Sequence, residues 1–346
     1  MPAMLAACAE AHPNIALIKY WGNRDHRINL PANSSISFNL DGLITRTLVV
    51  FDPHLNQDRL VINGRERYRE PLKRVQRILA WVREHSGKYL YAHVISVNNF
   101  PMEAGIASSA SAFAALALAA TRAVGLRLDE RALSRLARLG SGSACRSIPD
   151  GFVEWRAGVR DEDSYAFTLF PSEYWDLWDC IAIVSTASKP YSSKEGHRFA
   201  ETSPIQWARV TDAPRRLEWC RQALKNRDFQ ALAEVVELDA HLLHAVMQTS
   251  TPSLFYWEPA TVALMHQVRE WRKQGWNVAY TLDAGPNVHI LCTSDFAMRV
   301  EQALQARSDV QQVLIARPGK GARLVPLDLC RDLFRQGNLP LPTDLL

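Results

Sequence analysis

The sequence contains no apolar stretch long enough to cross a membrane. Its longest apolar run, residues 112–120, is short and rich in alanine, whereas a spanning helix needs about 20 apolar residues. No apolar segment follows a basic start, so a secretory signal is not expected. Basic and acidic residues nearly balance, with a net charge of +4, and no long basic run occurs. We therefore expect a cytoplasmic protein with neither a membrane nor a nucleic-acid partner.

Cysteine pairs with metal-binding or redox spacing are also missing. The six cysteines are scattered along the chain, and none forms a C-x-x-C motif. We therefore expect reduced thiols. His241 and His244 share one expected helix, but no carboxylate partner accompanies them, so packing or surface positions are favoured over a metal site. We predict no metal-ligating side chains.

The length of 346 residues suggests two domains or one large two-lobed unit. Apolar residues at helical spacing predict a helix over residues 71–85, and residues 43–51 are rich in β-branched residues, which predicts a strand. Further helices are expected over residues 108–124, 129–139, 204–225, 229–248, 259–274 and 295–306. Later strands are expected over residues 180–185, 277–283, 288–293 and 310–316. This mixed order favours an α+β protein with antiparallel sheets.

One segment, residues 101–110, has the character of a phosphate-binding loop. Gly105 allows a sharp turn, and Ser108 and Ser109 stand at the start of a helix rich in alanine and leucine. The free N–H groups and the positive dipole end of such a helix favour a polyphosphate. The alternative is a plain serine-capped helix after a glycine turn. The patterns G-x-x-x-x-G-K-[ST] and G-x-G-x-x-G are absent, so neither the Walker loop nor the dinucleotide fingerprint applies.

The pattern P-x-x-x-G-[IL]-A-S-S-A in this segment resembles the ATP-binding motif of the GHMP kinase superfamily. Three further motifs, NIALIKYWG, GSGSACRS and DAGPN, resemble one branch, the diphosphomevalonate decarboxylases; they occupy residues 14–22, 140–147 and 283–287. LPANSSIS at residues 30–37 extends the first match. The resemblance implies a two-lobed GHMP kinase fold with the active site in the cleft between lobes, divided into residues 1–185 and 186–346.

The same resemblance implies the ligands and the assembly. ATP and Mg²⁺ would bind, with Gly105, Ala107, Ser108 and Ser109 on the nucleotide. The partner would be a small molecule, a mevalonate that carries phosphate at its 5-position. The protein would be a homodimer.

Lys19 and Asp283 are far apart in the sequence, and each alone could be a surface or turn residue. The resemblance makes them catalytic: the aspartate faces the tertiary 3-hydroxyl of the substrate, and the lysine keeps it ionised. In the implied reaction the 3-hydroxyl takes the terminal phosphate of ATP, and loss of phosphate and CO2 leaves an alkene. Arg74 would clamp the substrate carboxylate with both guanidinium nitrogens, although a solvated helix face is an equal alternative.

The residues that the resemblance assigns to the 5-phosphoryl tail have hydroxyl or cationic side chains: Tyr20, Ser141, Ser143, Arg146, Ser193 and Lys194. Gly140 and Gly142 would let the backbone fold tightly around an anion. Without the other motifs, a glycine–serine loop beside a surface arginine would explain the same residues.

Two departures from the family pattern concern this tail. Asn23 stands where the family has a second lysine, so one positive charge is missing, and Lys194 stands where part of the family has an arginine. A lost charge-assisted contact costs about 1.5–3 kcal/mol of binding. We therefore favour mevalonate 5-phosphate over the 5-diphosphate, although Arg24, His26 or Arg198 could replace the charge. The alternatives to a decarboxylase are a kinase that stops after phosphorylating the 3-hydroxyl and an inactive binding protein of the same fold.

Overall fold

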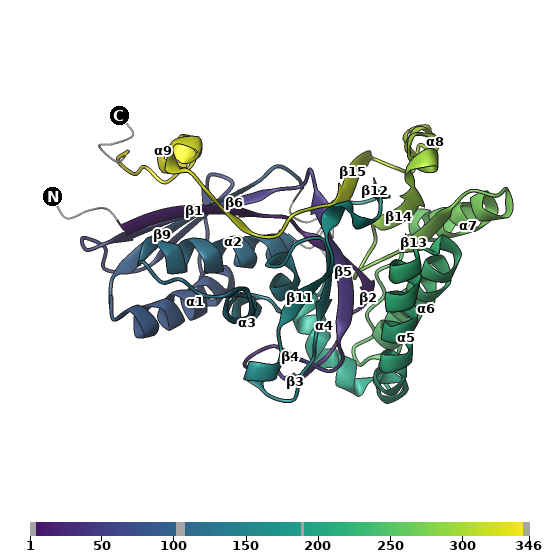
Figure 1. Ribbon diagram of the computed structural model, residues 1–346, viewed down its shortest axis with the longest axis horizontal. Helices are drawn as coiled ribbons and strands as arrows, with labels where there is room; N and C mark the ends of the chain where they lie inside the picture. Colours follow the sequence, from purple (N-terminus) through teal and green to yellow (C-terminus); the bar gives the residue numbers. More distant parts are fainter. Residues whose placement is uncertain (1–4, 102–107, 188–189, 342–346) are drawn as a thin grey trace.

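Two sheets and their covering helices build the molecule in the computed structural model, which describes residues 5–101, 108–187 and 190–341 (Figure 1). The first sheet has six strands in the order β16–β1–β6–β9–β7–β8. Its neighbours run antiparallel except β7 and β9, which are parallel. The strand bounds are β1 (Leu5–Ala11), β6 (Thr45–Asp52), β7 (Arg59–Ile62), β8 (Arg65–Glu66), β9 (Tyr91–Asn98) and β16 (Arg323–Val325).

Helices cover both faces of this first sheet. On one face lie α1 (Glu70–Ser86), α2 (Ser108–Ala123) and α3 (Glu130–Gly140). The apolar residues of α1 at helical spacing are buried against the sheet, as the sequence pattern predicts. On the other face, the short elements η5 (Leu327–Cys330) and α9 (Arg331–Gln336) cover Cys8, Leu48 and Val50. The end of the chain therefore returns to the lobe in which the chain begins.

The expectation that every cysteine is a free thiol is wrong for one pair. Cys8 and Cys330 form a disulfide across 322 residues of chain, from β1 to the start of α9. Both side chains are buried beneath α9, where Leu333 and Phe334 also pack. Cysteine spacing could not predict this bond, because only the return of the chain to β1 brings the two sulfurs together. The other four cysteines are free and buried.

The second sheet has eight strands, in the order β11–β10–β5–β15–β12–β14–β13, with β2 also paired to β5. All its pairs are antiparallel. The bounds are β2 (Asn14–Ile18), β5 (Ser35–Asp41), β10 (Phe152–Trp155), β11 (Ala166–Phe170), β12 (Leu177–Ile183), β13 (Val278–Thr281), β14 (Val288–Thr293) and β15 (Gln312–Pro318). A small hairpin, β3 (Asn23–Asp25) with β4 (Leu30–Pro31), projects beside it.

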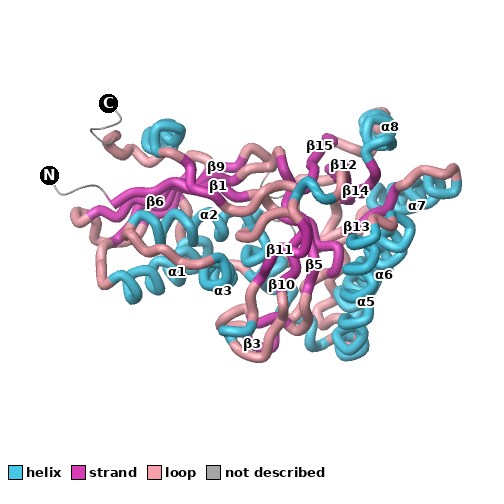
Figure 2. Tube along the Cα trace, viewed as in Figure 1, coloured by secondary structure: helices cyan, strands magenta, loops and turns pink. Residues whose placement is uncertain are grey.

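The helices of the second lobe lie outside this sheet, as Figure 2 shows. Two of them, α5 (Gln206–Asn226) and α6 (Phe229–Thr249), bury apolar residues against β2 and β5. Two others, α7 (Pro259–Lys273) and α8 (Ser294–Gln305), pack on β13 and β14. The shorter elements are α4 (Ser193–Phe199), η1 (Gly142–Ser147), η2 (Asp161–Asp163), η3 (Ser172–Tyr174) and η4 (Ala200–Thr202).

The α+β architecture is confirmed, and the expected helices agree with the observed ones to within a few residues. The strands β1, β2 and β5 carry no strand pattern that periodicity could detect, because alanine, serine and asparagine occupy many of their positions. No helix among the described residues is long and apolar enough to span a membrane. The division into residues 1–185 and 186–346 stays a prediction.

Candidate active site

The structure brings Lys19 and Asp283 into contact. Lys19 directly follows β2, and Asp283 stands just beyond the end of β13, 264 residues later. The Lys19 Nζ atom donates to the Asp283 Oδ1 atom at 2.9 Å. The lysine side chain is 2% exposed and the aspartate side chain 29% exposed. The amine is therefore enclosed, while part of the carboxylate remains open to a substrate.

The charge state of Asp283 follows from its neighbours. Burial alone would raise the pKa of this carboxyl, but the charges of Lys19 and His289, the Lys19 hydrogen bond and the charge of Arg146 lower it further than burial raises it. Its pKa is therefore below the ordinary value of 3.8. Burial likewise lowers the pKa of Lys19, and the Asp283 carboxylate opposes that shift. At neutral pH Asp283 is a carboxylate, which can accept a proton or a hydrogen bond.

Arg146 is buried in η1 beside this pair. Its Nε atom donates to Asn14 Oδ1 at 3.1 Å and to Ser37 Oγ at 3.0 Å, and its Nη1 atom donates to Ser35 Oγ at 2.7 Å. Because the charge of Arg146 acts on the pKa of both Lys19 and Asp283, it lies within electrostatic range of them. The guanidinium can therefore act on an anion at the reacting end of the site.

Arg74 is fixed at the junction of α1 and α3. Its Nε atom donates to the Gly140 carbonyl oxygen at 3.0 Å, and its guanidinium lies 4.5 Å from the centre of the Phe113 ring. Burial lowers the pKa of this arginine to about 10. A side chain at Gly140 would collide with the Phe113 ring, so glycine is required for this close packing. Arg74 is thus held directly beside Ser141 and is not a solvated helix residue.

The phosphate loop meets the glycine–serine loop at two serines. Ser109 Oγ, at the start of α2, lies 3.1 Å from Ser141 Oγ. The backbone of Gly142 approaches the Tyr20 ring so closely that a Cβ atom would lie 2.6 Å from it. Ser143 uses its carbonyl oxygen to accept a bond from Asn14. Ser141, predicted for the substrate, therefore lies beside Ser109, predicted for the nucleotide, at the N-terminus of α2.

Two of the predicted nucleotide residues, Gly105 and Ala107, lie outside the described residues. Ser108 begins α2, and its carbonyl oxygen accepts a bond from Ser111 Oγ. Within the described ranges, no group of three His, Cys, Asp or Glu side chains could hold a metal ion. The oxygens near this helix end are serine hydroxyls, which suit Mg²⁺ that is bound mainly by nucleotide phosphates.

At the predicted phosphoryl end, Tyr20 is part of a cluster of aromatic rings and an amide. Its hydroxyl donates to Asn23 Oδ1, and Asn23 Nδ2 lies 3.3 Å from His26 Nδ1. The Tyr20 ring stacks on His197 with the ring centres 4.2 Å apart. Burial raises the pKa of the Tyr20 phenol, so it stays protonated. Arg24 bonds the carbonyl oxygens of Pro31, Ala157 and Gly158.

Lys194 is bound to a carboxylate on another helix. Its Nζ atom donates to Glu70 Oε2 at 3.0 Å, which ties α4 to the first turn of α1. Ser193 is the first residue of α4, and Ser192 caps that helix in a capping box with Glu195. The predicted substrate lysine and serine therefore sit on a short helix at the edge of the site, where the lysine already has an anionic partner.

Sequence reasoning missed the groups that surround Lys19 from the second lobe. Asp239 and Arg209, from α6 and α5, bond the backbone of Lys19. His244, also on α6, is buried against Trp257, and burial together with the charge of Lys19 lowers its pKa to about 3. The only signal in the sequence is that these charged and polar residues interrupt otherwise apolar helix faces.

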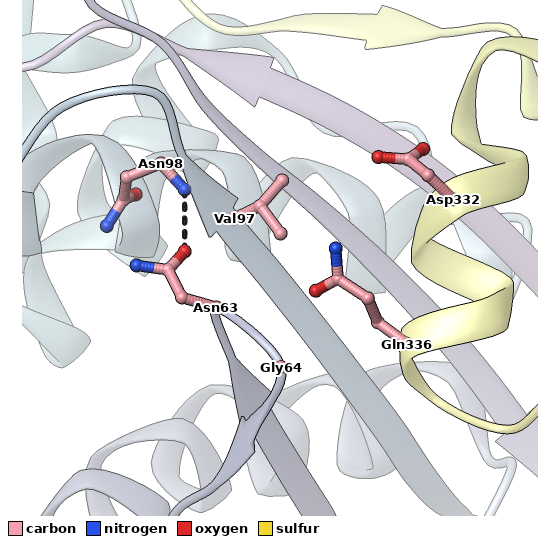
Figure 3. Close-up of a pocket in the computed structure, with 6 residues that line it drawn as sticks. All are labelled: Asn63, Gly64, Val97, Asn98, Asp332 and Gln336. Carbon is pink, nitrogen blue, oxygen red and sulfur yellow. Dashed lines mark hydrogen bonds between the residues drawn. The ribbon is translucent and has the colours of Figure 1, made fainter.

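A pocket of about 460 Å³ lies apart from this pair, at the end of β9. Figure 3 shows its six lining residues: Asn63, Gly64, Val97, Asn98, Asp332 and Gln336. The Asn98 backbone N–H donates to Asn63 Oδ1 at 3.0 Å. Asn63 follows β7, Asn98 ends β9, and Asp332 and Gln336 belong to α9, so the pocket lies on the α9 face of the first sheet.

Comparisons with known proteins identify the family of the chain. The model of the diphosphomevalonate decarboxylase-like N-terminal domain matches residues 11–166, and that of the mevalonate 5-diphosphate decarboxylase C-terminal domain matches residues 180–323. The human diphosphomevalonate decarboxylase is 38% identical over 84% of this chain and 78% of its own length. The rat enzyme of that name is 34% identical over 96% of this chain and 87% of its own.

Solved structures give the same result. Mevalonate diphosphate decarboxylase from Staphylococcus aureus has a TM-score of 0.88 and 36% identity, covering 93% of this chain and 98% of its own. The enzyme from Enterococcus faecalis has a TM-score of 0.86 and 37% identity over 93% and 99%. The fold and the serine-rich start of α2 define an ATP-dependent enzyme of the GHMP kinase superfamily. The chain belongs to the mevalonate diphosphate decarboxylase family and is a carboxy-lyase.

Proposed function

We propose that this enzyme decarboxylates a 5-phosphorylated mevalonate with consumption of ATP. The observation that carries the proposal is the contact between Lys19 and Asp283, which supplies an ionised and partly open carboxylate next to an enclosed ammonium. A relative, MDDEF, is described in complex with MVAPP, AMPPCP and magnesium, which supports ATP and Mg²⁺ as ligands here too.

The chemistry follows from the groups around that pair. Asp283 accepts the proton of the tertiary 3-hydroxyl while the oxygen of that hydroxyl takes the terminal phosphoryl group of ATP. The phosphate then leaves with its bonding electrons, the neighbouring carboxylate is lost as CO2, and its electron pair forms the alkene. Lys19 keeps Asp283 ionised. Arg74 and Arg146 bind anionic groups of the substrate.

We propose that the nucleotide phosphates lie at the N-terminus of α2 near Ser108, Ser109 and Ser141. Mg²⁺ would neutralise the phosphate charge there.

We also propose the 5-monophosphate as the preferred substrate. The relatives are named for the diphosphate substrate, which does not support this choice. The proposal therefore rests on the residues of this chain. Asn23 is neutral and bonded to Tyr20. Arg24 is bonded to backbone carbonyls, and Lys194 is paired with Glu70. Arg146, the other cation assigned to the tail, already donates to Asn14, Ser35 and Ser37. We infer that this end favours one phosphate over two, because each phosphate is stabilised mainly by charge-assisted bonds.

One assay tests both the decarboxylase activity and the preference for one or two phosphates at the 5-position. The protein is incubated with ATP, Mg²⁺ and each of mevalonate, its 5-phosphate and its 5-diphosphate, and ADP, CO2 and the alkene product are quantified. We expect CO2 release in step with ADP and the highest kcat/KM for the 5-phosphate. A preference for the diphosphate would refute the monophosphate proposal. ADP release without CO2 would instead indicate a 3-hydroxyl kinase, and no ADP with any substrate would indicate a binding protein.

The role of Asn23 is tested by restoring the family charge. Asn23→Lys should raise kcat/KM for the diphosphate relative to the monophosphate by about 10-fold or more, since a charge-assisted bond contributes about 1.5–3 kcal/mol. Asn226→Lys adds the same charge at an exposed position of α5 and should leave the ratio unchanged. We further propose a cytoplasmic homodimer, which light scattering of the purified protein would test.

A further inference from the structure

The backbone of Lys19 is held at both ends by charged side chains from the second lobe. The Lys19 N–H donates to Asp239 Oδ2 at 2.6 Å. The Lys19 carbonyl oxygen accepts from Arg209 Nη2 at 2.9 Å and from Asn33 Nδ2 at 2.9 Å. The peptide groups on either side of this residue therefore cannot shift without breaking bonds to α5 or α6.

The charges that hold Lys19 belong to a buried cluster of ion pairs. Arg216 Nε donates to Asp239 Oδ1 at 2.7 Å, and Arg216 Nη2 donates to the Arg209 carbonyl oxygen at 2.9 Å. Arg209 Nη2 lies 3.9 Å from Asp239 Oδ2. Asp239 and Arg216 are 0% exposed and Arg209 is 2% exposed. Arg216 Nη1 also donates to Asp212 Oδ2 at 2.5 Å, and that carboxylate is 37% exposed. The cluster is therefore buried around Lys19 and reaches the surface on the far side of Arg216.

Such a cluster is a costly way to pack two helices. Removing ions from water carries a large free-energy penalty, and apolar residues of similar volume would pack as well. The rest of the interface between α5 and α6 is apolar, with Leu217, Leu224 and Leu232 in the shared core. The charged groups are concentrated where the helices meet Lys19. Their position therefore calls for an explanation other than packing.

We propose that Asp239, together with Arg209 and Arg216, is a positioning unit that fixes the Lys19 backbone so that its ammonium stays against Asp283. This inference rests on the proposed function of the Lys19–Asp283 pair. It adds a role for residues that touch no substrate: they act through Lys19 alone. If these bonds are broken, the Lys19 ammonium can move away from Asp283. The Asp283 carboxylate then loses the positive charge that keeps it ionised.

The ionisation of Asp283 is the readout that distinguishes positioning from general stability. The charged and titratable groups that act on it come from four elements: Lys19 after β2, His244 on α6, Arg146 in η1 and His289 on β14. Of these, Lys19 has the largest effect on the pKa of Asp283. A variant that displaces only Lys19 should therefore move this pKa upwards.

The test variant is Asp239→Asn, which keeps the shape and removes the charge. We expect kcat to fall about 10-fold or more, with KM for ATP and for the mevalonate phosphate changed less than about 3-fold. The acid limb of kcat should move to higher pH. The second variant, Arg209→Lys, keeps the positive charge but loses the paired guanidinium bonds to Lys19 and Asn33. We therefore expect its acid limb to move to higher pH by a smaller amount.

Asp58 supplies the matched control. It is 3% exposed, accepts the Ala92 backbone N–H at 2.9 Å and pairs with Arg83, but it lies in the first lobe away from the cleft. Asp58→Asn should lower the thermal midpoint as much as Asp239→Asn and leave kcat and the acid limb unchanged. The positioning role would be overturned if Asp239→Asn and Asp58→Asn had the same acid limb. It would also be overturned if both Asp239→Asn and Arg209→Lys kept the wild-type acid limb.

A direct titration separates this inference from the proposed function. Carbon-13 NMR of the Asp283 carboxyl, assigned by its loss in Asp283→Asn, reports the pKa without any turnover. If the wild-type protein releases no CO2 from any mevalonate phosphate but the Asp283 pKa rises in Asp239→Asn, the proposed function fails and the positioning unit stands. If CO2 is released and the pKa does not move, the positioning unit fails alone.

Discussion

The two ends of the proposed substrate site are built in opposite ways. At the reacting end, the Lys19 side chain is 2% exposed and its ammonium donates to the Asp283 carboxylate. At the phosphoryl end, Lys194 and Glu70 form an exposed pair, with side chains 41% and 66% accessible. The first end is assembled before any substrate arrives, whereas the second can exchange partners when an anion binds.

This difference has an energetic reason. A buried charge needs fixed partners, since an unpaired one costs several kcal/mol, so a site made of buried charges changes little. An exposed pair contributes about 0.2–1 kcal/mol and is easily replaced. The chemistry is therefore fixed at one end, and the choice between substrates can change at the other. The following variants sharpen or break this contrast.

The largest effect should come from Asp283→Asn. The amide cannot accept the hydroxyl proton as a carboxylate does, and loss of a general base costs on the order of 10²- to 10⁴-fold in rate. We expect kcat to fall about 10³-fold in the CO2-release assay, with KM for ATP changed by less than about 3-fold. Asp309→Asn, which breaks a partly buried pair with Arg307, is the control and should behave like wild type. Near-normal turnover by Asp283→Asn would remove the assigned base.

Lys19→Gln should have the next largest effect, through the pKa of Asp283. The folded-state pKa of Asp283 is lowered, so the carboxylate form is favoured above the unfolded value of 3.8 and is lost as the pH falls through the lower folded value. Without the ammonium, burial raises that pKa instead. The acid limb of kcat/KM, measured from about pH 4.5 to 8.5, should move to higher pH.

Lys194→Gln gives the contrast for this experiment. It removes the same charge from the exposed end, where no described contact reaches Asp283. Its acid limb should match wild type, while KM for the substrate rises. An equal shift of the limb in both lysine variants would show that the two ends are not independent.

The disulfide should affect stability and not catalysis. Replacing Cys8 and Cys330 by serine removes a disulfide that joins residues 322 positions apart. Loss of a native disulfide lowers the free energy of unfolding by about 2–4 kcal/mol. Urea unfolding of oxidised protein should show this loss, while kcat stays within about 2-fold because α9 lies far from Asp283 in the first lobe. Added reductant should destabilise wild type and leave the double variant unchanged. The opposite pattern would mean that the two thiols are not bonded in solution.

The smallest effect should come from Glu70→Gln, which releases Lys194. An exposed ion pair contributes about 0.2–1 kcal/mol, so KM for the phosphorylated substrate should fall by up to about 5-fold. Steady-state kinetics with both phosphorylated substrates would measure this. Glu270→Gln breaks a comparable exposed pair with Lys273 on α7 and should change nothing. A change in kcat with constant KM would argue against a role of Lys194 in binding.

The long helices could be predicted from the sequence because their apolar spacing is a local property. The helix over residues 71–85 is observed as α1 (Glu70–Ser86), and residues 288–293 form β14 as expected. The strands β2 and β5 could not be found by alternation because both of their faces are buried and small polar residues occupy several positions. They were visible only as motifs.

The candidate site shows the same division. Lys19, Asp283, Arg74 and the serine loops could be named from motifs, because each motif is a short contiguous segment. Asp239, Arg209 and the Cys8–Cys330 bond could not be named. Their partners are backbone groups or distant side chains, and nothing local marks such a residue.

The sequence by itself determined the α+β class, the helices and the residue types that the proposed chemistry needs. Only the tertiary structure decided that an aspartate 264 residues from a lysine meets it at 2.9 Å and that two helices hold that lysine by its backbone. The physical reason is range. Helix spacing and turn chemistry act over a few residues, whereas the ionisation of a buried carboxylate depends on every charge that folding brings near it.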